Sequence, residues 1–320
     1  MIFGLNFDHQ GGANIQDNFN SINTTDKEKT VWLHFDADSN ETREFVDQNL
    51  SHLDPHIKRA VLAEQTRPRY VPFENGFLLI IRGVNLNKDQ SHEDMISLRL
   101  WIEKNRIISF QKRNLQTVSE LKDSLINGKG PKSISEFIQK LIEILVFKME
   151  VPFDELIKDT DNFEMLDLNL LSKTQGDRLS NIRKKCAIFS RYLIPQAEAI
   201  NSMINNSNDI LISEQDLKKI NESYHDILRR VEDISSLKER IQFIYDEHSH
   251  VISEKMNKTM YKIAIISMIF IPISFLTGLL GINLSGIPYA SSGSAFIGFS
   301  ILLSLVLVIQ LIIYKKLKWI

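Results

Sequence analysis

The chain has 320 residues and carries 38 Lys and Arg against 40 Asp and Glu, which gives a net charge of −2. This balance excludes the basic excess of a general nucleic-acid binder, and the length allows one large domain or two smaller ones. The only cysteine, Cys186, excludes an intrachain disulfide and a zinc site built from cysteines of one chain, and it fits a reducing compartment. The N-terminus lacks the basic and apolar regions of a signal peptide, so we expect the polar part to stay where it is made.

The first part of the chain predicts an α/β domain. Residues 1–30 are rich in Asn, Asp, Gly and Thr, and we expect a flexible N-terminal segment there. Residues 31–132 form the predicted cytoplasmic α/β domain, which ends after a Gly- and Pro-containing loop at 128–131. Its predicted strands are Val31–Phe35, Phe77–Val84, Met95–Ile102 and Arg106–Gln111, and its predicted helices are Glu41–Leu50 and Asp54–Ala63, the second of which starts at an Asp-Pro capping signal.

From residue 133 the apolar positions recur every three or four residues, which predicts a cytoplasmic helical region over 133–213. Glu214–Ile271 then contains no Gly and no Pro, and a heptad stripe of apolar residues predicts a long stalk helix over 214–262. Its members are Leu217, Ile220, Tyr224, Ile227, Val231, Ile234, Ile241 and Ile244, with Lys238 at the skipped position. Continued to Gly281, the helix would be roughly 100 Å long and would link a cytoplasmic domain to the membrane. The alternative is a coiled-coil stalk that only oligomerises.

The last part of the chain predicts two membrane spans. No Asp, Glu, Lys or Arg occurs between Ile263 and Tyr314. Two apolar runs near the length of a bilayer core predict transmembrane helices over 263–283 and 296–314, joined by an uncharged outer loop over 284–295. Lysines precede the first span and form a basic tail over 315–320. Because basic residues mark the cytoplasmic side, we expect a multi-pass protein of the cytoplasmic membrane with both termini in the cytoplasm.

One face of the first predicted span combines small, polar and apolar side chains. Small residues let helices approach closely, hydroxyls and freed carbonyls can line a water path, and apolar rings can gate by dewetting. Periodicity alone supports helix packing and pore lining equally. Two spans per chain are too few to enclose a pore, so a pore requires an oligomer with one such stripe from each subunit. The predicted pore stripe is Asn257, Met260, Ile263, Ser267, Ile271, Ser274 and Gly278.

A Gly-x-Asn sequence follows this stripe at the predicted helix end. Gly281 would end the helix and free its last carbonyls. A ring of Asn283 side-chain oxygens would offer neutral acceptors that hold a cation through its hydration shell, without the cost of stripping the water. We therefore expect Gly281, Ile282 and Asn283 to form the selectivity filter.

These features closely resemble the CorA superfamily of divalent-cation transporters. The segment Met256–Asn283, with Pro272 inside the helix, resembles the CorA pore helix, and the two C-terminal spans and the Lys-Lys-x-Lys-Trp ending also match. The usual CorA signature is Gly-Met-Asn, whereas this chain has Gly-Ile-Asn and continues as Leu284–Pro288, which looks like the ZntB branch of bacterial zinc transporters. Glu64–Arg69 also resembles a ZntB cytoplasmic segment, and the resemblance covers most of residues 30–320.

The resemblance implies a homopentamer with a funnel-shaped cytoplasmic domain and one central pore. It implies that the stripe lines this pore and that Gly281 and Asn283 form the selectivity ring at its outer face. It implies uptake of Zn²⁺ with no resident cofactor, and it leaves proton coupling open. Magnesium-type members often carry acidic residues in the outer loop, and 284–295 has none. The alternatives are a CorA-type Mg²⁺/Co²⁺ channel and a non-conducting, membrane-anchored sensor or scaffold; Ni²⁺ and Cd²⁺ are further candidate ions. The lysines of the tail, Lys315, Lys316 and Lys318, predict a basic cytoplasmic ring.

Two pairs of residues in the polar part are candidate metal ligands. Asp246 and His250 are four residues apart, so they share one face of the stalk helix and predict a zinc-handling site. Asp36 and Asp38 follow the first predicted strand and predict a cation site between subunits. The alternatives are a solvated helix face and an ordinary loop. No set of nucleophile, base and acid stands out, so an enzyme is the least expected class.

Overall fold

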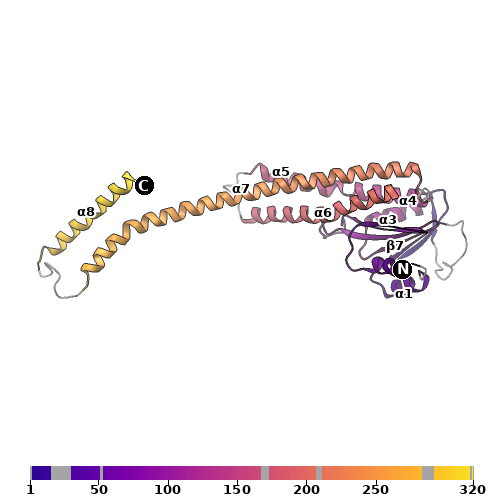
Figure 1. The fold of residues 1–320 in the computed structure, drawn as a ribbon, viewed down its shortest axis with the longest axis horizontal. Coiled ribbons are helices and arrows are strands. Elements are labelled where there is room, and N and C mark those ends of the chain that lie inside the picture. Colours follow the sequence, from indigo (N-terminus) through magenta and orange to yellow (C-terminus); the bar gives the residue numbers. More distant parts are fainter. Residues whose placement is uncertain are drawn as a thin grey trace. The chain divides into compact units, whose positions relative to one another are not determined.

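The computed structural model describes residues 2–15, 30–50, 53–166, 173–206, 211–282, 292–317 and 319. The chain divides into two compact units, Met1–Ile244 and Tyr245–Ile320. The first unit holds a sheet flanked by helices, and the second holds the last part of helix α7 (Glu214–Leu280) and helix α8 (Ala295–Lys316) (Figure 1). The fold class predicted from the sequence is confirmed: an α/β region is followed by a long helix and two candidate C-terminal spans.

The sheet of the first unit has the strand order β2-β1-β3-β7-β6-β5-β4 in the described part of the chain. Neighbouring strands are antiparallel except for β3 and β7, which are parallel. The four predicted strands are confirmed, with ends that differ by at most one residue. The strands are β1 Phe3–Phe7, β2 Ala13–Ile15, β3 Val31–Asp36, β4 Arg69–Phe73, β5 Gly76–Gly83, β6 Ile96–Glu103 and β7 Arg106–Gln111.

Strands β1 and β2 correct the expectation of a flexible segment over residues 1–30. Phe3, Leu5 and Phe7 alternate with smaller or polar residues, and Leu5 and Phe7 are buried in the core. β1 pairs with β3, so its backbone groups enter the sheet's hydrogen bonds. This alternation of apolar residues is short, and the Asn- and Gly-rich composition of the surrounding segment obscures it in the sequence. Residues 16–29 lie outside the described residues.

Helices cover both faces of the sheet. Helices α1 (Asn40–Asn49) and α2 (Pro55–Leu62) lie on one face, over a core that includes Phe35, Ile80 and Phe110. The predicted cap of α2 is confirmed, because an oxygen of Asp54 accepts a hydrogen bond from the backbone N–H of His56 at 2.7 Å. The other face carries α3 (Gln116–Ile126) and α4 (Ile134–Phe147), together with parts of α6 (Lys173–Asn206) and α7. Figure 1 shows α1 and these longer helices on opposite sides of β7.

Most of the heptad stripe of α7 is buried inside the first unit, and its remaining members Leu217, Tyr224 and Val231 are half-buried. Ile220, Ile227, Ile234 and Ile241 are each at most 1% exposed, and the burial ends at Ile244. The last part of the stripe packs against residues of α5 (Glu150–Glu164) and α6. Full burial of such a side chain contributes roughly 1.5–3 kcal/mol. Packing within one chain therefore explains the stripe, which does not need to form a seam between chains.

Arg240 fastens α7 to α5 close to the end of this buried stripe. Its Nε donates to Glu164 Oε1 at 2.6 Å, and one terminal nitrogen donates to Glu164 Oε2 at 2.7 Å and to Asp161 Oδ1 at 2.6 Å. Hydrogen bonds to Glu164 and Asp161 raise the pKa of Arg240. A guanidinium that donates to two carboxylates in a fork fixes direction as well as distance. The first unit therefore holds α7 firmly just before the helix enters the second unit.

Candidate pore segment

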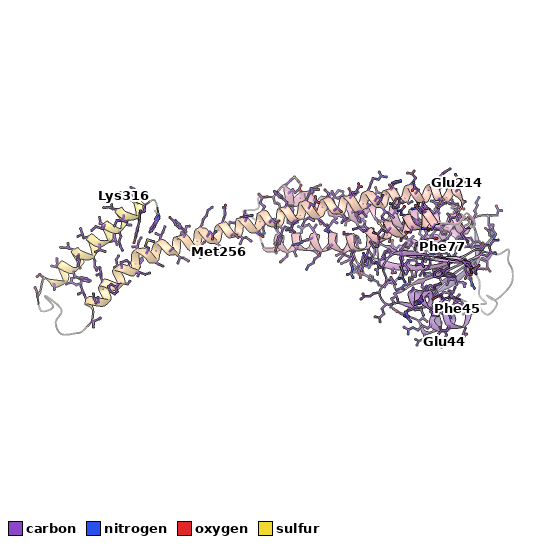
Figure 2. The ribbon with its side chains drawn as sticks, in the orientation of Figure 1. Glu44, Phe45, Phe77, Glu214, Met256 and Lys316 are labelled. Carbon is purple, nitrogen blue, oxygen red and sulfur yellow. The ribbon has the colours of Figure 1, made fainter. Side chains whose placement is uncertain are left out.

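Two helices of the second unit have the composition of membrane spans. By length and composition, α7 and α8 can each cross a membrane, and none of the most apolar part of either helix is buried within the structure. Figure 2 draws the side chains of both helices and labels Met256 on α7 and Lys316 at the end of α8. Apolar side chains that are exposed in this way need lipid or neighbouring helices to cover them.

The predicted pore stripe lies on an uncovered face of α7. At about 100° per residue, its seven members fall within an arc of about 120°. Six of them are exposed and Ser267 is half-buried; Met260, Ile263 and Ile271 are 61%, 58% and 65% exposed. The other partly buried side chains of this segment gather on the opposite side: Ile265, Met268, Ile269, Pro272, Ile273 and Leu276. The stripe is therefore open to a neighbouring helix or to a water-filled path.

Pro272 creates a specific link between the two spans. A proline has no N–H, so the carbonyl of Met268, four residues earlier, loses its helical hydrogen-bond donor. The hydroxyl of Tyr314 in α8 donates to this carbonyl at 3.3 Å. Within a bilayer a freed carbonyl needs another donor, and Tyr314 supplies it. This role of Tyr314 was not predicted from the sequence, where the proline inside an apolar span is the signal that could have indicated it.

Helix α7 ends at Leu280, directly before the predicted filter. The N–H of Gly281 donates to the carbonyl of Thr277 at 2.9 Å, and a Cβ at Gly281 would lie 2.9 Å from that same oxygen. Glycine therefore fits this close approach better than any other residue. Ile282 is 46% exposed. Asn283 and the rest of the segment up to residue 291 lie outside the described residues.

The candidate metal ligands of the polar part do not assemble into larger clusters within the described residues. Asp36 Oδ1 accepts a hydrogen bond from the N–H of Asp38 at 3.0 Å, and Asp38 Oδ1 lies 2.5 Å from Lys112 Nζ. Asp246 and His250 are exposed on α7 in the second unit. No group of three or more His, Cys, Asp or Glu that could hold a metal ion occurs in the described parts of the chain. Each pair would need further ligands, such as water or another subunit, to complete a cation site.

The predicted basic ring is described in part. Lys315 and Lys316 are exposed in the last turn of α8, where positive charge also complements the helix dipole. Lys318 lies outside the described residues.

Comparisons with known proteins agree on one family. The family description CorA-like Mg²⁺ transporter protein matches residues 27–316. The divalent cation transporter CmaX of Pseudomonas aeruginosa is 31% identical over 323 residues, which cover 100% of this chain and 96% of the relative. The zinc transport protein ZntB of Vibrio parahaemolyticus is 29% identical over 89% of this chain and 88% of its own length. The solved structure of the full-length CmaX protein matches with a TM-score of 0.79 and 31% identity over 99% of this chain and 98% of that chain.

Proposed function

Because the chain belongs to the CorA superfamily of divalent-cation transporters, with relatives in the ZntB branch, we propose that it takes up Zn²⁺ through a pore at the centre of a homopentamer. Its activity is divalent-cation transport, and its relatives are transporters and not enzymes. The observation that carries the choice of Zn²⁺ is the Gly-Ile-Asn sequence followed by a loop without acidic residues, together with 29% identity to a zinc transport protein. The alternative is a Mg²⁺/Co²⁺ channel, and the family description names Mg²⁺.

In this proposal α7 forms the wall of the pore. The stripe from Asn257 to Gly278 faces the path, α8 lies on the outer side of α7, and Asn283 forms the ring at the outer mouth. Its support is the open face of α7 opposite the side that Tyr314 contacts. The lysines that flank both spans support cytoplasmic termini in the inner membrane. The heptad stripe gives little support to a non-conducting coiled-coil scaffold, because most of the stripe is already buried inside one chain.

The first prediction concerns assembly. Since one chain supplies two candidate spans, a conducting path needs several copies, and we expect the protein extracted in mild detergent to be a pentamer. Native mass spectrometry measures the number of subunits directly. A stable monomer or dimer, in protein that retains bound lipid and shows the helical content of the fold, would count against the pore.

The second prediction concerns the ion. In liposomes loaded with a fluorescent metal indicator, we expect Zn²⁺ influx to exceed Mg²⁺ influx at equal concentration. The sequence Gly-Ile-Asn-Leu-Ser-Gly-Ile-Pro at the mouth resembles the ZntB branch, and residues 284–295 offer no carboxylate that would concentrate Mg²⁺ there. The same liposomes with and without an imposed pH gradient test proton coupling. Robust Mg²⁺ flux with negligible Zn²⁺ flux would overturn the choice of Zn²⁺ while leaving divalent-cation transport intact.

A further inference from the structure

Five described lysines lie where the apolar segment of α7 begins and where the apolar segment of α8 ends. Lys255, Lys258 and Lys262 precede the apolar part of α7, and Lys315 and Lys316 end α8. All five are exposed. The one carboxylate within this segment of α7 is Glu254, whose Oε2 lies 3.5 Å from Lys258 Nζ. The local charge is therefore strongly positive.

The lysines of α7 lie on the side of the helix that faces away from the predicted pore stripe. Their spacing of three and four residues places them within an arc of about 60°. The centre of this arc is on the opposite side of the helix from Met260, Ser267 and Ser274. It is on the same side as the partly buried residues that surround Met268, where Tyr314 of α8 reaches α7. The charges thus belong to the outer surface of the helix pair and not to the ion path.

An aromatic clasp brings the lysines of α8 to this same surface. The hydroxyl of Tyr261 donates a hydrogen bond to the carbonyl of Trp319. Trp319 in turn donates its backbone N–H to the carbonyl of Tyr314 at 2.9 Å, and the two rings stack with centroids 6.1 Å apart. Trp319, which follows α8, therefore lies against α7 next to Lys262. Tyr and Trp in such a position are typical of the bilayer interface.

From this arrangement we propose that the lysines of α7 and α8 form a binding site for the headgroup of an anionic phospholipid such as phosphatidylglycerol. The aromatic clasp of Tyr261, Tyr314 and Trp319 lies beside these lysines. A phosphate that carries a full negative charge complements the five ammonium groups, and its acyl chains would lie along the apolar surface of the two helices. Lysine clusters next to a membrane span attract anionic lipids through this electrostatic term. The transported cations are repelled by the same charges. The proposal rests on the membrane placement of α7 and α8 and not on the identity of the transported ion.

The position of tryptophan provides a direct test. The chain has three tryptophans, and Trp32 and Trp101 are 1% and 2% exposed in the first unit, whereas Trp319 belongs to the clasp. The full-length protein is reconstituted in phosphatidylcholine vesicles that contain a fixed fraction of either brominated phosphatidylglycerol or brominated phosphatidylcholine. Bromine quenches tryptophan fluorescence at contact, so the ratio of the two quenching levels measures the preference of the Trp319 region for the anionic lipid.

We expect brominated phosphatidylglycerol to quench several-fold more effectively than brominated phosphatidylcholine, and 1 M salt to reduce this preference. The double variant Lys258→Gln/Lys262→Gln should lose most of it, and Lys258→Arg/Lys262→Arg should keep it. The matched control Lys218→Gln/Lys219→Gln removes two exposed lysines of α7 in the first unit and should leave the preference unchanged.

Equal quenching by the two lipids in the natural sequence would overturn the proposal, and so would a preference that the Lys258 and Lys262 variant retains. If that variant assembles poorly, the test is to measure the lipid that co-purifies with the unaltered protein in mild detergent. Phosphatidylglycerol retained at a fixed ratio to protein supports the site, and the absence of retained phosphatidylglycerol contradicts the site. Zn²⁺ flux in pure phosphatidylcholine vesicles is measured in parallel, so that a failure of transport is distinguished from a failure of lipid binding.

Discussion

Asn283→Ala should abolish or severely reduce divalent-cation transport while leaving assembly intact. In the proposed pore, the methyl group of alanine cannot accept the hydrogen bonds of the cation's water shell, so the outer ring loses its acceptors. Asn283 follows the exposed Ile282 in the sequence, and in the proposed pore it meets water at the outer mouth, so we expect stability to change by no more than roughly 1 kcal/mol. Metal flux into liposomes and native mass spectrometry measure the two effects. The control Asn205→Ala makes the same change at an exposed position of α6.

Asn283→Asp is the sharper variant at this position. It keeps an oxygen acceptor and adds up to one negative charge per subunit, and mutual repulsion should raise the pKa of some of these carboxyls. We expect tighter cation binding but slower release, because conduction needs binding that is weak enough to let the ion leave. Normal flux and selectivity in both correctly assembled variants would mean that Asn283 is not the filter.

The strands that the sequence predicted are those with a strong apolar pattern in the middle of the sheet. β5, β6 and β7 are buried along most of their length, and apolar residues make up half or more of each strand, which gives a clear strand signal. β4 was missed because it contains Pro72, which is accepted only where no neighbour needs the missing N–H; β4 lies at the edge and pairs with β5 alone. α3 was missed because its N-cap residue is Leu115, which is not one of the Ser, Thr, Asp or Asn residues that mark a helix start in the sequence.

The sequence predicts which face of α7 carries the candidate pore residues, but it does not predict how the second span packs on α7. The spacing of the residues from Asn257 to Gly278 places them on one face of the helix, because an α-helix has 3.6 residues per turn. The spacing cannot tell which side of α7 the second span covers, because that depends on contacts between distant residues such as Tyr314 and Met268. The heptad stripe shows the same difficulty, because a repeat that packs within one chain has the same pattern as a repeat that joins two chains.

The buried imidazole of His34 makes the stability of the first unit depend on pH. His34 lies on β3, is fully buried, and stacks on Phe3 with ring centroids 4.9 Å apart. Its Nδ1 lies 2.7 Å from the hydroxyl of Ser109, which also accepts a hydrogen bond from Trp32 Nε1 at 2.8 Å. Burial lowers the pKa of His34 from 6.5 to about 3; Gln111 acts in the opposite direction and the charge of Lys122 in the same direction as burial.

The sign of the effect follows from proton uptake. Above pH 6.5 the imidazole is neutral in the folded and the unfolded chain, so stability does not depend on this group. Between pH 6.5 and about 3 the unfolded chain binds a proton that the folded chain does not, and stability falls as the pH falls, by up to about 1.4 kcal/mol per pH unit. From pH 7 to pH 4.5 this one group should therefore remove roughly 2–3 kcal/mol from the free energy of unfolding.

His34→Gln should flatten this dependence. Glutamine keeps a polar group near Ser109 but does not titrate, so the variant should lose roughly one proton from the pH slope of its unfolding free energy, even if the substitution itself costs roughly 1–2 kcal/mol at pH 7. The measurement is denaturant unfolding of the full-length protein in detergent, followed through Trp32 and Trp101 fluorescence from pH 7 to pH 4.5. His56→Gln makes the same chemical change at an exposed position of α2 and serves as the control. If His34→Gln and the natural sequence share one slope, the buried imidazole does not control acid stability. The expected result is a smaller pH slope for His34→Gln and an unchanged slope for His56→Gln, because His34 is buried and His56 is exposed.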